Sequence, residues 1–114
     1  KIGEDAVPAL IQALQDKDAN VRGNAVLALG SIEKGAIDAV PALIQALQDP
    51  NEDVRMNAAR ALGSIGEDAK DAVPALIQVL QDQNEWVCKG VAKALGSIGT
   101  PEALKAVEEY QLRQ

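Results

Sequence analysis

The sequence predicts an all-α fold: a right-handed α-solenoid made of three helical hairpins and a C-terminal capping helix. Two observations carry this prediction, an internal repeat with a period of 33 residues and an apolar pattern of helical spacing within each copy. A third observation is the composition. Hydrophobic residues make up 47% of the 114 residues and aromatic residues only 2%, so small aliphatic side chains must form the core. Such side chains favour closely packed helices over strands.

Two motifs define the repeat. Ala-Val-Pro-Ala-Leu-Ile-Gln begins at Ala6, Ala39 and Ala72, and Ala-Leu-Gly-Ser-Ile begins at Ala28, Ala61 and Ala94. Adjacent copies of one unit are typical of a solenoid, in which each copy packs on its neighbours. We therefore expect one domain over 1–114, with repeats at about 5–37, 38–70 and 71–99 and a capping helix at 100–113.

The first helix of each copy is predicted from a single apolar stripe. Val7, Leu10, Ile11 and Leu14 fall at i, i+3, i+4 and i+7. A proline lies in the first turn of this helix, where a backbone N–H would have no helical partner in any case. We expect an aspartate to cap the helix in the second and third copies, namely Asp38 and Asp71.

The second helix begins after a favourable N-cap residue, which is Asp18, Asn51 or Asn84 in the three copies. Gly66 and Gly99 follow it in the second and third copies, as glycines that end helices do. A further glycine lies inside each second helix at constant spacing, at Gly30, Gly63 and Gly96. Glycine there costs about 1 kcal/mol relative to alanine, so we expect these positions to allow close approach between neighbouring helices.

The two ends of the chain differ from the repeats. Thr100-Pro101-Glu102 predicts an N-cap, a proline and an acidic first turn, and so begins a final helix that covers the third copy. At the other end, Ile2-Gly3-Glu4-Asp5 is similar to the end of a repeat, Ile65-Gly66-Glu67-Asp68. We therefore expect part of a longer array, whose uncapped first repeat can associate end to end with another chain.

Composition excludes several classes of function. The chain has no His and one Cys, which excludes His-based catalysis, His-ligated metal sites and disulfides within the chain. Its formal net charge of −6 argues against a nucleic acid partner. Apolar runs are too short to span a membrane. We therefore expect a cytoplasmic protein that is not an enzyme and has no cofactor, catalytic residue or metal site.

With these motifs in place, the chain resembles the short HEAT-like repeats of the phycobilisome-lyase type. The resemblance rests on Ala-Val-Pro-Ala-Leu-Ile, Val-Arg and Ala-x-Ala-Leu-Gly-Ser-Ile-Gly and covers almost the whole chain. It implies three HEAT-like hairpins. Ankyrin repeats share the 33-residue period, but their Thr-Pro-Leu-His signature is absent. Relatives of this type include bilin lyase subunits, so a lyase or isomerase component that handles a tetrapyrrole chromophore is the alternative function. A di-iron hydroxylase relative is excluded because its metal motifs need His.

The resemblance also implies a structural ladder of hydrogen bonds between an Asp and an Arg six residues apart. It maps onto Asp16 with Arg22 and onto Asp49 with Arg55. In the third copy Cys88 stands where the arginine would be. We expect Cys88 to be a packing residue, because no His and no motif that would lower its pKa accompanies it.

Positions that vary between otherwise identical copies are candidates for binding. At about 100° per residue, three equivalent positions of each second helix face outward. They are Asn20, Gly23 and Leu27 in the first copy, Asp53, Met56 and Arg60 in the second, and Trp86, Lys89 and Lys93 in the third. We expect this face to be concave, with Leu27, Met56 and Trp86 as an apolar track and Arg60, Lys89 and Lys93 as its basic flank. The alternative is that Trp86 folds over the terminal helix near Tyr110.

These positions predict a non-catalytic protein–protein interaction scaffold. Its partner would be a protein or peptide held by a few apolar anchors, because Trp and Arg are enriched among the residues that dominate binding energy.

Overall fold

The computed structural model describes residues 6–32 and 37–114. Within these ranges the chain is helical and without strands, which confirms the predicted all-α solenoid. Its elements are α2 (Val7–Ala13), α3 (Ala19–Ile32), α4 (Val40–Ala46), α5 (Glu52–Ile65), the 3₁₀ helix η2 (Gly66–Ala72), α6 (Val73–Val79), α7 (Glu85–Ile98) and α8 (Pro101–Leu112). The repeat end expected at Ile2-Gly3-Glu4-Asp5 lies outside the described residues.

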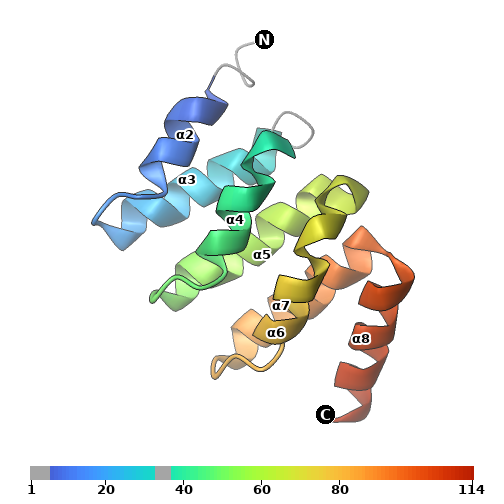
Figure 1. Ribbon diagram of the computed structural model, residues 1–114. Helices are drawn as coiled ribbons and strands as arrows, with labels where there is room; N and C mark the ends of the chain where they lie inside the picture. Colours follow the sequence, from blue (N-terminus) through green and yellow to red (C-terminus); the bar gives the residue numbers. More distant parts are fainter. Residues whose placement is uncertain (1–5, 33–36) are drawn as a thin grey trace.

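The helices form two layers that step along one axis (Figure 1). The first helices of the hairpins, α2, α4 and α6, lie in front of the second helices, α3, α5 and α7. Helix α5 packs between α3 and α7, and α8 packs on α7 and α6 at the C-terminal end. The second helices therefore form a continuous row, as stacked repeats require.

Aliphatic side chains between the two layers form the core. Leu29, Leu62 and Leu95 occupy the same position in the three second helices and are fully buried. Leu43 of α4 and Leu76 of α6 belong to the same core and are also fully buried. The core is thus built from the aliphatic residues that the composition predicted.

The predicted ends of the second helices are confirmed. Asn51 Oδ1 accepts hydrogen bonds from the backbone N–H groups of Asp53 and Val54 at 2.8 and 3.2 Å. Asn84 does the same for Trp86 and Val87 at the start of α7. Gly66 and Gly99 follow α5 and α7 with φ of 77° and 72°, a backbone conformation that side chains disfavour.

The predicted aspartate caps of the first helices are wrong. Helices α4 and α6 have Ala39 and Ala72 at their N-caps, without a side-chain hydrogen bond, and Asp38 and Asp71 are exposed. Both N-cap residues have right-handed helical φ and ψ because a 3₁₀ turn leads directly into each helix. A side chain caps a helix most effectively from an extended residue, which is missing at these entries.

Close approach at the helix-interior glycines is confirmed at two of three positions. A Cβ on Gly30 would lie 3.0 Å from the Cα of Ala61, and a Cβ on Gly63 would lie 3.1 Å from the Cα of Ala94. The expectation is wrong for Gly96, whose Cβ would meet no atom within 4 Å. Over the described ranges, no further second helix follows α7 in the row, so nothing packs against Gly96.

Candidate functional site

Helices α5 and α7 enclose an open groove of ≈ 520 Å³ on the second-helix layer. Five of the six predicted partner-binding residues line this groove, namely Met56, Arg60, Trp86, Lys89 and Lys93. The sixth, Leu27, lies on α3 outside the groove, and its side chain is 44% exposed. The structure therefore brings together the second and third copies of the predicted surface and leaves the first copy apart.

The floor of the groove is made by small residues. Gly63, Gly90 and Ala94 line it together with Ser64 and Ser97. A Cβ on Gly90 would lie 3.6 Å from Met56 Cγ, so Met56 lies against the bare backbone of α7. Ala94 lies in the same way against Gly63, so the two glycines let α5 and α7 approach closely beneath the groove.

Trp86 is the largest exposed apolar residue at this site, with 67% of its surface accessible. It occupies the first turn of α7, where its backbone N–H donates to Asn84 Oδ1 at 2.8 Å. The alternative placement against Tyr110 is wrong, since Tyr110 packs on the core while Trp86 lies in the groove beside Met56. The exposure of Trp86 follows from its position on the variable face of the helix.

Lys89 stabilises the position of the Trp86 ring. Its Nζ lies 4.9 Å from the ring centroid, within the range of a cation–π interaction. The same ammonium lies 3.5 Å from Glu85 Oε1, one helical turn back. This ion pair is largely exposed, and such pairs contribute at most about 1 kcal/mol.

Charge is distributed unevenly along the groove. Arg60 and Lys93 occupy equivalent positions in neighbouring copies, so they lie on the two walls of the groove. At the other side of Trp86 a smaller pocket of ≈ 240 Å³ is lined by Glu52 and Asp53. Met56, Arg60 and Trp86 line this smaller pocket as well, so acidic side chains of α5 lie beside the tryptophan, and Lys93 lies two turns further along α7.

Sequence reasoning misplaced one member of the outward face and missed the groove floor. Gly23 is buried, because α5 covers it with Asn57 and Val54. Ser64 and Ser97 were missed because serine recurs at this position in every copy, whereas the predicted binding residues differ between copies. Glu52 was not predicted as a residue of the site. The close approach of neighbouring helices expected at Gly63 could have indicated that small residues line the space between them.

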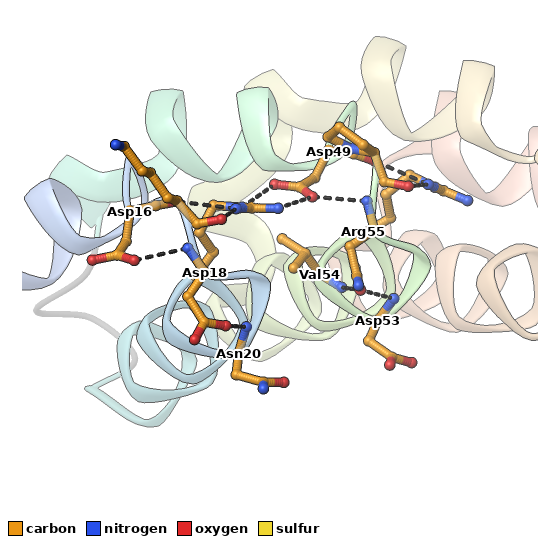
Figure 2. A network of polar contacts seen from close by, with 11 residues as sticks. Asp16, Asp18, Asn20, Asp49, Asp53, Val54 and Arg55 are labelled. Atoms are coloured by element: carbon orange, nitrogen blue, oxygen red, sulfur yellow. Dashed lines mark hydrogen bonds and ion pairs between the residues drawn. The ribbon is translucent and has the colours of Figure 1, made fainter.

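Arginine and aspartate side chains link successive hairpins at the loops between their two helices (Figure 2). Arg22 donates from Nε and Nη2 to the carboxylate of Asp49, at 2.7 and 3.0 Å, and Arg55 binds Asp82 in the same way, at 2.7 and 3.1 Å. Each pair joins residues 27 positions apart and therefore joins two copies. Within a copy, Arg22 reaches the backbone carbonyl of Asp16 at 2.9 Å.

The pKa of Asp49 and that of Asp82 lie below the ordinary value. Burial acts to raise each pKa, but the hydrogen bonds from Arg22 or Arg55, from a backbone N–H and the arginine charge together lower it. The ladder changes at Cys88, whose thiol donates to the carbonyl of Asp82 at 3.1 Å. Burial, followed by the charge of Asp82, raises the pKa of this thiol.

The described residues contain no cluster of His, Cys, Asp or Glu arranged to hold a metal ion. No helix within the described ranges combines the length and the apolar character needed to cross a bilayer.

Comparison with protein families identifies this architecture. A model of HEAT repeats matches residues 1–43 and 40–113. The chain belongs to the HEAT-repeat family. Comparison with curated proteins gave no significant match.

Solved structures similar to this HEAT-repeat chain include engineered proteins. An engineered protein matches with a TM-score of 0.76 and 30% identity over 94% of this chain and 51% of its own. Computationally designed armadillo repeat proteins for modular peptide recognition match with a TM-score of 0.71 and 25% identity, over 94% of this chain and 53% of theirs. A designed armadillo repeat protein in complex with peptide (KR)4 matches at 24% identity and a TM-score of 0.75, which shows the fold alone. The HEAT-repeat chain thus spans about half the length of these proteins.

Proposed function

We propose that this chain is a non-catalytic cytoplasmic scaffold that binds a peptide segment of a protein partner in the α5–α7 groove. The observation that carries the proposal is Trp86, a large apolar side chain that is 67% exposed and lines a groove. Tryptophan and arginine dominate binding energy at many interfaces, and this groove contains both. A single, buried cysteine is consistent with a reducing compartment.

The shape of the groove supports a peptide as the occupant. The groove is open and lined by small residues between its walls, and the flexible Met56 can adapt to the shape of a bound side chain. The similar designed armadillo repeat proteins were made for modular peptide recognition, which supports the same kind of partner. Leu27 would extend this surface by one repeat and contribute less, because it lies outside the groove.

The experiment that tests this function selects binders from a displayed library of random peptides on the immobilised chain. Dissociation constants of the enriched peptides are then measured by fluorescence anisotropy. Trp86→Ala should weaken binding by about tenfold or more, as for a central anchor. Leu104→Ala is the matched control, since Leu104 is 50% exposed on α8 and outside the groove, and it should leave affinity unchanged. Equal affinities in the two variants would refute the proposal.

The tetrapyrrole alternative predicts a different result in the same preparation. A bilin held by this groove would give a visible absorption band in the purified chain after incubation with the pigment. This band would be lost in Trp86→Ala and retained in Leu104→Ala. Binding of selected peptides without such a band favours the scaffold over a phycobilisome-lyase-type component.

A further inference from the structure

The proposed groove is basic although the chain as a whole is acidic. Arg60, Lys89 and Lys93 line it, and no carboxylate does so. Among the described residues, Arg60 and Lys93 have no carboxylate within ion-pairing distance, and only Lys89 has one, at 3.5 Å in an exposed pair. These cations are therefore available to a bound molecule at little cost.

Within the groove, nearby charges affect a bound ligand more than the net charge of the chain does. The formal net charge of −6 repels an acidic ligand at a distance. At physiological ionic strength, however, interactions between exposed charges are screened over about 8 Å. A carboxylate close to Arg60 and Lys93 therefore responds mainly to these two cations, since Lys89 is already paired with Glu85.

The order of the groups along the groove sets the order of residues in the ligand. Trp86 and Lys93 are seven positions apart on α7, which corresponds to about 10 Å along the helix axis. An extended peptide covers that distance in about three residues. Asp53 occupies the position of Trp86 in the preceding copy, so Glu52 and Asp53 present negative charge beside Trp86, about two turns before Arg60 on α5.

We infer that the occupant of this groove is an acidic peptide segment with one apolar side chain as its anchor. The apolar side chain lies against Trp86 and Met56 over the small-residue floor. Carboxylates about three positions away along the peptide pair with Arg60 and Lys93. The peptide residues next to this anchor, which face Glu52 and Asp53, are uncharged or basic. This inference rests on the proposed function and adds the chemical class and the polarity of the partner.

The test uses the sequences of the peptides selected on the intact chain. Peptides whose affinity falls in Trp86→Ala are the groove-dependent set. We expect this set to carry net negative charge, with an apolar residue and acidic residues about three positions apart. A groove-dependent set that is basic or uncharged overturns this inference and leaves peptide binding in place. If no enriched peptide depends on Trp86, the proposed function fails, and this inference fails with it.

Charge reversal provides a second measurement on one enriched peptide. The double variant Arg60→Glu/Lys93→Glu should weaken its binding by about tenfold or more, because attraction becomes repulsion. Lys70→Glu/Lys105→Glu changes the net charge equally at exposed positions outside the groove and should change affinity by less than about twofold. Circular dichroism on both double variants shows whether the helices are retained. Equal losses of affinity in the two folded variants would overturn the inference.

Discussion

Gly63 and Ala94 lie in contact across the interface of α5 and α7. A Cβ on Gly63 would be 3.1 Å from the Cα of Ala94 and 3.2 Å from its Cβ. Gly30 has the same relationship to Ala61 one copy earlier, whereas Gly96 in the third copy faces open space over the described residues. The equivalent glycine of each copy is therefore packed against a neighbouring helix in the first two copies and faces open space in the third.

Alanine at Gly63 and alanine at Gly96 should have opposite effects. Gly63→Ala places a methyl group against backbone and should lower the free energy of unfolding by about 1–3 kcal/mol. Gly96→Ala meets no neighbour and should raise it by about 0.5–1 kcal/mol, because alanine is favoured over glycine in a helix. Urea denaturation of both variants measures the two values. A change of the same sign in both would contradict the packing of α5 on α7.

Asp49→Asn should destabilise the fold by about 1–3 kcal/mol, because it removes the charge that accepts two hydrogen bonds from Arg22. Asp71→Asn is the matched control. Asp71 is exposed and does not cap α6, so its substitution should cost less than about 0.5 kcal/mol. Both values come from chemical denaturation at neutral pH. A large cost at Asp71 would instead indicate the cap that its position in the sequence suggested.

Stability should decrease in acid. The pKa values of Asp49 and Asp82 are lower in the folded chain than the ordinary value of 3.8. Their stabilising contribution is therefore complete above that value and is lost as the pH falls through the lower folded pKa values. The free energy of unfolding, measured from pH 7 down to pH 2, should drop below about pH 4. The drop should be smaller in Asp49→Asn, and an equal drop would assign the acid sensitivity to other carboxylates.

Cys88 should be unreactive in the native chain. It is buried, its thiol donates to the carbonyl of Asp82, and its pKa is raised, so little thiolate is present at neutral pH. Modification by a chromogenic disulfide reagent should be slow in buffer and fast in urea. Fast modification of the folded chain, at the rate of a free thiol, would show that the site is open.

Trp86 should be quenched more strongly by an anion than by a cation. Its ring is exposed, Lys89 Nζ lies 4.9 Å from its centroid, and Arg60 and Lys93 line the same groove. Iodide should therefore accumulate near the ring and caesium should be repelled. The preference should decrease or reverse in Arg60→Glu/Lys93→Glu and persist in Lys70→Glu/Lys105→Glu. Since Trp86 is the single tryptophan, selective excitation reports this site alone.

Local sequence patterns predicted the helices, and they failed where two copies meet. Asn51 and Asn84 were identified as caps because capping depends on residues within one turn. The ladder pairs of Arg22 and Arg55 were harder to assign. Every copy but the last carries both partners, so the sequence does not distinguish a pair within a copy from a pair between copies.

The groove was predicted only in part, because it also forms where two copies meet. Trp86, Lys89 and Lys93 were identified on one helix face, but which neighbouring copy completes the site depends on how the helices stack. Gly23 and Gly96 were misassigned because equivalent positions are covered in some copies and open in others. The role of Leu27 and the end-to-end association of the first repeat stay predictions.

The Arg–Asp pairs couple the opening of each hairpin to that of its neighbour. Over the described residues, the middle hairpin is clamped on both sides, by Arg22 to Asp49 and by Arg55 to Asp82, and each outer hairpin is clamped on one side. Opening the middle hairpin breaks both of these ion pairs, whereas opening either neighbour breaks only one of them. Backbone amides of α5 should accordingly be the last to exchange with solvent, and Met56 and Arg60 are thereby held on the most persistent element of the chain.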